Sequence, residues 1–340
     1  MPVIHRPVLA LPDNEVALDE ILEHLERAYA HTPDLDRALR VVRACDVKTR
    51  RYARPLDEMA GASLGRRVEW HFADSCDLGE TAARQALAEA GLTPADVGVL
   101  IAVTSAGYRM PGLDIALSER LGLSSTTRRM PVISLGCAGA AYGLDRAVEQ
   151  ATLRPDQVVL VVCADMFPSF FHPDDIELDS MIFRGLMADG AAACVVRGGE
   201  SDHGPSITDS WHYTPPGTSD IVGYRLDGDG FHGFNSARLF SAIATFLPHL
   251  IDWFGGQPDF VVPHPGGPRI LRMLAAALPN GPALLENARR SLAEHGNMGA
   301  PSTMDILART FDDPPAPGSR GVLIGIGPGM TMIACRTTWH

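Results

Sequence analysis

The feature that most constrains the fold of this chain is the stretch VISLGCAGAAYGLDRA, which runs from Val132 to Ala147. Residues 131–135 form an apolar run, which predicts a buried strand. Gly136 turns the chain, and the small residues that begin at Ala138 predict a helix. Cys137 then lies between a strand and a helix N-terminus, where free backbone N–H groups favour a thiolate. A buried structural cysteine is the alternative interpretation, because free cysteines are among the most buried residues.

Apolar runs alternate with helical patterns along most of the chain, which indicates an α/β fold with parallel strands and helices layered over sheets. The segment from Asp165 to Asp189 is expected to be irregular. A strand followed by a polar residue, a glycine turn and a helix occurs in both halves, so two similar halves, residues 1–200 and 201–340, are expected to meet at one site. The other predicted strands are Val97–Val103, Val158–Cys163, Asp189–Val196, Ile207–Tyr213, Ile221–Asp227, Phe260–Val262, Val322–Ile324 and Met330–Arg336, and the predicted helices include Glu15–Ala30, Ala38–Cys45, Asp77–Ala90, Leu113–Leu121 and Ala237–Phe254.

The composition excludes several classes of function. The chain has 340 residues, of which 46% are hydrophobic, and this is enough to bury a large core. A formal net charge of -12 argues against nucleic acids and anionic membrane surfaces as partners. The six cysteines form no CxxC pair, and no apolar run reaches the roughly 18 residues of a membrane span. We therefore expect a reduced, cytoplasmic protein that has neither a disulfide framework nor a zinc site.

A basic cluster interrupts this acidic sequence near its beginning. Lys48, Arg50, Arg51 and Arg54 fall within seven residues of one another. Such a run is commonly a solvated surface, and in an acidic chain it is equally a seat for a phosphorylated ligand. Farther along, several phenylalanines between two predicted strands are candidates for the wall of an apolar pocket.

Three polar residues on glycine-marked loops form a candidate catalytic set: Cys137, His264 and Asn297. A cysteine thiolate is a strong nucleophile that forms thioesters. A nearby imidazole stabilises the thiolate, and a side-chain amide adds a second hydrogen-bond donor to a thioester carbonyl without titrating. The combination fits acyl transfer. Papain-type hydrolysis uses the same residue types, but its cysteine lies near the mature N-terminus in a different local sequence.

In seven blocks along nearly the whole chain, the sequence resembles the type III polyketide synthases, the chalcone synthase-like group of the thiolase-fold condensing enzymes. The blocks are CDVKTRRY, TSAGYRMPG, LGCAGA, HPDDIELDS with ADGAAACVV, HPGGPRIL, EHGNMGAPS and GIGPGMT. HPGGPRIL and GIGPG distinguish this group from the ketoacyl synthase III relatives. The resemblance implies a thiolase-like fold with two similar βα halves in an α–β–α–β–α arrangement.

The resemblance also implies roles for individual residues. Cys137 would carry the growing acyl chain, while His264 and Asn297 would bind the thioester carbonyl of malonyl-CoA and assist its decarboxylation. The implied substrate-binding residues are the gatekeepers Phe170 and Phe231, Ser105 on the cavity wall, Met110 at a dimer interface, Ile326 where many members have a phenylalanine that shapes the cyclisation cavity, and Lys48, Arg50 and Arg51 in the segment that contacts CoA phosphates.

The expected reaction is acylation of Cys137 by a starter acyl-CoA, followed by decarboxylative condensation with malonyl-CoA and cyclisation to a pyrone or resorcinol-type product. A homodimer is expected, with no metal and no cofactor beyond the CoA thioester substrates. The alternatives are a ketoacyl synthase III-like single condensation, a non-extending acyltransferase on the same fold, a cysteine hydrolase and a catalytically silent dimerisation partner. The intact cysteine, histidine and asparagine argue against the last of these.

Overall fold

The computed structural model describes residues 1–105, 107–171, 174–198, 203–228 and 230–340. The first of its two large sheets has six strands in the order β1–β8–β7–β5–β6, with β2 also paired to β8. Strand β5 pairs in parallel with β6 and β7, whereas β8 is antiparallel to β7, β1 and β2. These strands are β1 (Val3–Ile4), β2 (Val8–Ala10), β5 (Val97–Thr104), β6 (Arg128–Ile133), β7 (Val158–Asp165) and β8 (Gly190–Arg197).

The second sheet has four strands in the order β12–β13–β14–β9. Strands β12 and β13 are parallel, and β14 is antiparallel to both of its neighbours. The predicted parallel pairing holds for β5 with β6 and β7 and for β12 with β13, and is wrong for β8 and β14. A three-residue turn, Pro328–Met330, joins β13 to β14, and so short a connection permits only antiparallel pairing. The strands are β9 (Pro205–Tyr213), β12 (Phe260–Pro263), β13 (Arg320–Gly327) and β14 (Thr331–Trp339).

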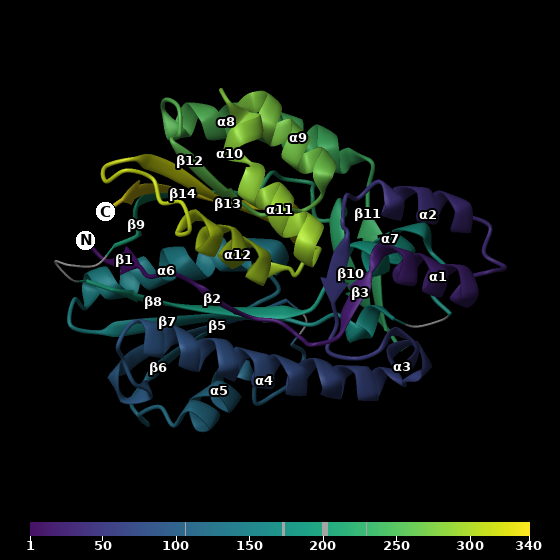
Figure 1. The fold of residues 1–340 in the computed structure, drawn as a ribbon, viewed down its shortest axis with the longest axis horizontal. Helices are drawn as coiled ribbons and strands as arrows, with labels where there is room; N and C mark the ends of the chain where they lie inside the picture. Colours follow the sequence, from purple (N-terminus) through teal and green to yellow (C-terminus); the bar gives the residue numbers. More distant parts are fainter. Residues whose placement is uncertain (106, 172–173, 199–202, 229) are drawn as a thin grey trace.

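Helices cover both faces of both sheets, so that five layers alternate in the order α–β–α–β–α (Figure 1). Helices α6 and α12 pack between the two sheets, and the small residues of α6, such as Gly139 and Gly143, allow it to lie against Val103 of β5. The predicted layered α/β fold is confirmed. The covering helices are α4 (Leu64–Glu89) and α5 (Leu113–Leu121) on the first sheet, α6 (Gly139–Leu153) and α12 (Ala300–Thr310) in the centre, and α8 (Arg238–Phe254) and α9 (Pro268–Ala277) on the second sheet.

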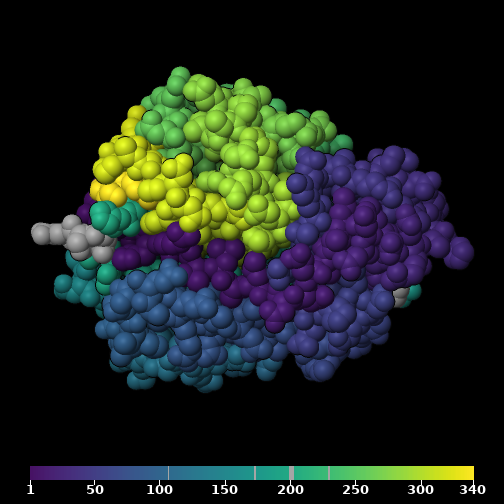
Figure 2. All heavy atoms as spheres, in the orientation of Figure 1, coloured from purple at the N-terminus to yellow at the C-terminus, as the bar shows by residue number. Residues whose placement is uncertain are grey.

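A cap of smaller elements closes one end of the layers, on the right in Figure 1. Its apolar side chains form a separate core in which Leu25, Leu39 and Tyr52 are buried. The elements are α1 (Leu18–Ala28), α2 (Leu35–Arg43), α3 (Leu56–Gly61), α7 (Leu178–Leu186), the β3–β4 pair (Glu15–Ala17 and Thr49–Arg51) and the β10–β11 hairpin (Val222–Leu226 and Phe231–Asn235). Outside the cap, α11 (Glu286–His295) lies beside α12, and α10 (Gly281–Leu284) lies beside α9. Figure 2 shows the N-terminal segment running along the seam between the earlier and later parts of the chain.

Helix α4 begins thirteen residues before the predicted start at Asp77. The prediction missed its first half because four polar side chains, those of Arg67, His71, Asp74 and Ser75, are buried there and break the apolar pattern. His71 hydrogen-bonds to the carbonyl of Met166, and Asp74 pairs with Arg54. Within the segment that was expected to be irregular, helix α7 spans nine residues. The sequence pattern therefore fails where burial of a polar group is compensated by a partner far away in the chain.

The strands of the first sheet end at Arg197 and those of the second begin at Pro205. The division into two halves at residue 200 stays a prediction. All six cysteines are free thiols. None of the helices in the described part of the chain combines the length and apolarity that a bilayer crossing requires.

Candidate active site

Cys137, His264 and Asn297 meet at one cavity of about 130 Å³. Cys137 follows β6, His264 follows β12, and Asn297 precedes α12. Strand ends and helix starts from both halves of the chain thus converge on one small, largely apolar space.

The turn that carries Cys137 has an unusual backbone. Ser134 and Gly136 adopt left-handed conformations, with φ of 64° and 50°. A Cβ atom on Gly136 would lie 2.5 Å from Cδ of Pro328, so only glycine lets the GIGPG loop pack against this turn. The turn presents a half-buried thiol to the cavity. Burial raises the pKa of Cys137 to about 12, the Asp165 carboxylate raises it as well, and a hydrogen bond from Asn297 acts in the opposite direction.

The His264 imidazole is buried and neutral. Its backbone N–H donates to the carbonyl of Ile324 at 2.7 Å, which fixes the residue at the end of β12. Nδ1 is enclosed and has no hydrogen-bond partner among the described residues, so the ring meets the cavity through Nε2. Burial lowers the pKa of His264 to about 3.

The amide of Asn297 is oriented by its own turn. Its Oδ1 accepts a hydrogen bond from the N–H of Gly299 at 2.9 Å, and its NH₂ group is therefore the part that faces Cys137. The backbone N–H of Asn297 donates to Leu186, and its carbonyl accepts from Ala188. The site thus brings two uncharged groups, the His264 imidazole and the NH₂ of Asn297, beside one thiol, and in its Nε2–H tautomer the imidazole is a second hydrogen-bond donor.

Asp165 is a buried residue behind the site that sequence reasoning missed. It ends β7, and its carboxylate accepts hydrogen bonds from the N–H and Oγ of Ser105, at 2.6 and 2.9 Å, and from the N–H of Ala300 at 2.9 Å. Burial raises the pKa of Asp165 to about 6. This carboxylate ties the Ser105 loop to the loop that carries Asn297. A carboxylate at the end of a buried strand was the signal that could have identified it.

The cavity walls contain three of the predicted substrate-binding residues, namely Ser105, Phe170 and Ile326. Phe231 lies behind the wall, fully buried, with its ring 5.7 Å from that of Phe170. Met110 lies away from the cavity on the surface, 95% exposed. Phe167 and Phe183, two of the phenylalanines predicted as wall material, also line the cavity, whereas Phe171 is buried in the core of the cap. Lining residues that the sequence did not single out include Ile182, Met187, Val222, Tyr224 and Leu239.

The basic cluster divides among different surroundings. Lys48 lines a second cleft of about 920 Å³. Arg51 pairs with Glu15 at 2.5 Å, and Arg54 pairs with Asp74. Arg50 is fully buried, and its guanidinium has no hydrogen-bond partner among the described residues. Of this cluster, the second cleft is lined by Lys48 and not by Arg50, Arg51 or Arg54.

The second cleft is basic and adjoins the catalytic cavity. It contains Arg43, Lys48, Arg272 and Arg289 against a single acid, Asp46. The N-terminal end of α9 contributes to the walls of both spaces: Pro268 and Leu271 line the cleft, and Gly266 and Ile270 line the cavity that contains Cys137. Of the four basic residues, the sequence prediction included Lys48 alone.

Comparison with known proteins identifies the family. Residues 50–200 match the model of the chalcone and stilbene synthases, N-terminal domain. The chain is 31% identical to the 1,3,6,8-tetrahydroxynaphthalene synthase of Streptomyces coelicolor, over 100% of this chain and 93% of that protein. The chain belongs to the type III polyketide synthases. The crystal structure of the S. coelicolor tetrahydroxynaphthalene synthase, titled a bacterial type III polyketide synthase, has a TM-score of 0.94 to this polyketide synthase at 29% identity and covers 99% of both chains.

Two further relatives support this assignment. Germicidin synthase of S. coelicolor, another type III polyketide synthase, has a TM-score of 0.92 at 29% identity and covers 100% of this chain and 99% of its own. The phloroglucinol synthase of Pseudomonas fluorescens is 28% identical over 97% of each chain. The predicted family, thiolase fold and acyltransferase class of this polyketide synthase are confirmed.

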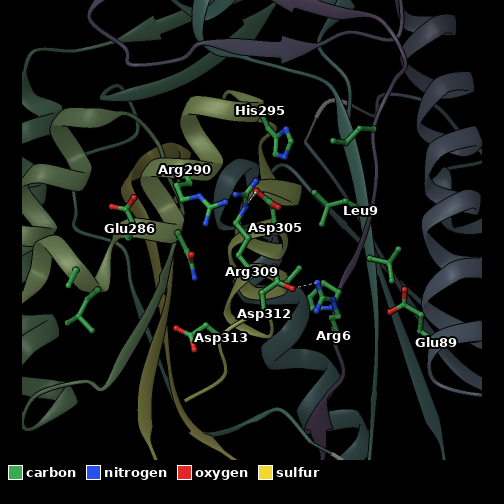
Figure 3. A pocket seen from close by; sticks show the side chains of 17 residues that line it. Arg6, Leu9, Glu89, Glu286, Arg290, His295, Asp305, Arg309, Asp312 and Asp313 are labelled. Carbon is green, nitrogen blue, oxygen red and sulfur yellow. Dashed lines mark hydrogen bonds and ion pairs between the residues drawn. The ribbon is translucent and has the colours of Figure 1, made fainter. Parts of the chain in front are cut away.

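A third groove, of about 810 Å³, lies elsewhere on this polyketide synthase, between the N-terminal segment and helices α11 and α12 (Figure 3). Its charged side chains pair with one another, as Arg6 does with Asp312 at 2.6 Å and Arg309 with Asp305 at 2.9 Å. None of the predicted site residues lines it. Within the described ranges, no group of three or more histidine, cysteine, aspartate or glutamate side chains is arranged to hold a metal ion.

Proposed function

We propose that this polyketide synthase loads a starter acyl group from an acyl-CoA onto Cys137 and extends it with malonyl-CoA. The observation that carries the proposal is the convergence of Cys137, His264 and the oriented amide of Asn297 on one cavity. The names of the relatives, among them a tetrahydroxynaphthalene synthase and a phloroglucinol synthase, support polyketide formation with ring closure.

In the loading step, Sγ of Cys137 attacks the thioester carbon of the starter. The C–S bond to CoA breaks, and the thiol proton leaves with the CoA sulfur. The developing oxyanion accepts hydrogen bonds from the NH₂ of Asn297 and from Nε2–H of His264. Because the pKa of His264 is lowered to about 3, the imidazole acts as a neutral donor throughout the neutral pH range.

In the extension step, malonyl-CoA would place its thioester carbonyl on the same two donors. Loss of CO₂ leaves an electron pair on the α-carbon and an enolate oxygen, which these donors stabilise. The carbanion attacks the Cys137 thioester, and the extended chain leaves on CoA while the cysteine is released as a thiolate. The apolar walls exclude water, which would otherwise protonate the carbanion.

The second cleft is a suitable seat for the nucleotide of CoA. Of its four basic side chains, Arg43 pairs with Glu26 and Arg289 with Glu286, while Lys48 and Arg272 complement phosphate groups. The start of α9 contributes residues to both this cleft and the cavity of Cys137. The catalytic cavity of about 130 Å³ is smaller than the roughly 300–1,000 Å³ typical of small-molecule pockets. We therefore propose a short starter acyl group.

A homodimer is part of this proposal. Strand β6 is the edge of the first sheet, and the side chain of Ile133 at its end is 58% exposed. Met110, in the loop after β5, is 95% exposed. An unpaired strand edge with exposed apolar side chains is suited to pairing with a second copy. The cytoplasmic location stays a prediction.

The test is mass spectrometry of the products formed from malonyl-CoA and a panel of acyl-CoA starters, with Cys137→Ala as the control. Pyrones or resorcinols that require Cys137 support the proposal. A single condensation product indicates a ketoacyl synthase III-like reaction. Acylation of Cys137 without malonyl-derived carbon in any product contradicts the proposal and leaves an acyltransferase, and free acid alone indicates a hydrolase.

A further inference from the structure

Helix α7 and strand β11 both contribute to the wall of the catalytic cavity, and they touch each other at two points that are one helical turn apart. In the first turn of α7, Asp179 accepts a hydrogen bond from the backbone N–H of Asn235 at 2.8 Å. Four residues later, the ring of Phe183 lies against Gly233 of β11. Residues i and i+4 share a face of a helix, and residues i and i+2 share a face of a strand. These two contacts therefore set how closely α7 approaches β11.

Gly233 has no room for a side chain. A Cβ atom at this position would lie 2.5 Å from Cδ2 and 2.9 Å from Cγ of Phe183. Carbon atoms in favourable contact are about 3.5–4.0 Å apart, so even a methyl group would displace the ring. Gly233 lies within the regular β10–β11 ladder, opposite Tyr224, and its backbone is not left-handed. The ring of Phe183, and not the backbone conformation, is therefore what requires a glycine here.

The ring of Phe183 lines the catalytic cavity and stacks on Phe170, with 5.7 Å between the ring centres and an interplanar angle of 4°. Phe170 is only 2% exposed, and three further rings, those of Phe167, Tyr224 and Phe231, pack on it at 5.6 to 5.9 Å. Phe170 is thus enclosed and has little room to yield. The cavity is the space into which a displaced Phe183 ring can move.

The capacity of the cavity depends on the position of this ring. The cavity has a volume of about 130 Å³, so a small movement of one aromatic side chain takes up a large share of it. With glycine at position 233, the ring of Phe183 rests on the backbone of β11. A side chain at position 233 would push the ring away from β11 and toward the space that Cys137 shares.

We propose that Gly233 is a positioning residue: by lacking a side chain it holds the ring of Phe183 against β11, and the pair thereby sets the size of acyl group that the cavity admits. Gly233 itself does not line the cavity and acts only through Phe183. A larger residue at position 233 narrows the cavity, and a smaller residue at position 183 widens it. The link to acyl size rests on the proposed function.

The test measures cavity size without relying on that function. Cys137 is alkylated at one fixed alkaline pH with iodoacetamide and with the bulkier N-benzyl iodoacetamide, and the two rates are determined by intact-protein mass spectrometry. The ratio of the rates cancels the ionisation of the thiol. The variants are Gly233→Ala, Phe183→Ala and the two combined. The control is Gly98→Ala, a strand glycine whose new Cβ would have the flexible side chain of Gln157 as its nearest neighbour, at 3.0 Å.

We expect Gly233→Ala to lower the bulky-to-small ratio about tenfold, because overpacking by one methyl group changes an equilibrium by that order. Phe183→Ala should raise the ratio about tenfold, since it removes the ring from the wall. In the Phe183→Ala background, Gly233→Ala should leave the ratio unchanged, because the ring that it displaces is gone. A merely structural role of Gly233 would alter stability without this coupling.

Two results overturn the proposal: a ratio that Gly233→Ala leaves at the wild-type value or changes no more than Gly98→Ala does, and a ratio that Gly233→Ala lowers equally with and without the Phe183 ring. If Gly233→Ala alone does not fold, the double variant decides. Recovery of its melting temperature, together with a raised ratio in Phe183→Ala, supports the pair, and failure of either overturns it.

Acyl-CoA starters of increasing length then separate the two proposals. The expected alkylation ratios with no acylation by any acyl-CoA leave the role of the Phe183–Gly233 pair standing and remove the proposed function. Acylation with the same preferred length in wild type and in every variant removes the role of the pair and leaves the function.

Discussion

The protonation state of Cys137 is open to a direct test. Burial raises the pKa of Cys137 to about 12, and the neutral His264 supplies no positive charge to oppose it. We therefore expect the resting enzyme to hold a thiol, and the rate of alkylation by iodoacetamide to rise about tenfold per pH unit between pH 6 and 10, because only the thiolate reacts.

The magnitude follows from the fraction of thiolate. With a pKa of about 12, about one Cys137 in 10⁵ is ionised at pH 7, whereas a cysteine with an ordinary pKa of about 8.5 is ionised to about 3%. The expected rate constant at pH 7 is thus about 3,000-fold below that of a free cysteine. The free-energy cost of forming the Cys137 thiolate would be offset only while a bound substrate places its carbonyl on the two donors.

The assay is the time course of a single mass addition, with Cys137→Ala to subtract reaction at the other five cysteines, all of them buried. Asn297→Ala is expected to slow alkylation further, because it removes a hydrogen bond that stabilises the thiolate. A rate that reaches a plateau below pH 8 would refute the reasoning, since it would mean that Cys137 and His264 form a thiolate–imidazolium pair in the resting enzyme.

Three further perturbations have defined outcomes. His71 is buried with its pKa lowered from 6.5 to about 4, so the folded state binds its proton less tightly than the unfolded state, and stability is lost as pH falls from 6.5 to 4. Denaturant titrations of His71→Gln should show about 3 kcal/mol less loss across that window than wild type; parallel curves would contradict this. Gly299→Ala should cost roughly 2–4 kcal/mol and most activity, because φ is 70° and the new Cβ would lie 2.4 Å from a buried carboxylate, whereas Gly61→Ala meets nothing within 4 Å and should be neutral. Lys48→Ala should raise KM for CoA thioesters about three- to tenfold with kcat unchanged, while Arg51→Ala should leave KM unchanged; equal effects would remove the assignment of the second cleft.

The layers of the fold could be predicted because each buried strand is a continuous apolar run. β5, β7 and β13 all show this pattern, and their predicted positions differ from the observed ones by at most three residues at either end. Strand direction could not be predicted in the same way, because an apolar run reports burial on both faces and is the same for either direction. The short strands β1 and β2 pair with β8, which is far from them in the sequence, and no local sequence pattern indicates that pairing.

The convergence of Cys137, His264 and Asn297 could be predicted because each one follows a strand end or precedes a helix beside glycines. The walls of the cavity could be predicted only in part, at Ser105, Ile326 and the phenylalanines after β7, because the other lining residues come from segments that are remote in the sequence. Met187 and Tyr224 reach the same space as Cys137 from the end of α7 and from β10. Phe231 carries the expected sequence context but lies one layer behind the wall, which is a difference of distance that a sequence does not contain.

The number of basic residues near position 50 did not predict which of them reach the surface, whereas the alternation of side chains along a strand does. Residues 49–51 form a strand, so Thr49 and Arg51 lie on one face and Arg50 on the other. Arg50 faces inward with Val16, its partner on β3, and burial lowers the pKa of the Arg50 guanidinium. Arg51 remains at the surface and is paired with Glu15. Alternation along a strand therefore divides adjacent cations into a buried one and an exposed one, while Lys48, the residue before the strand, lines the second cleft.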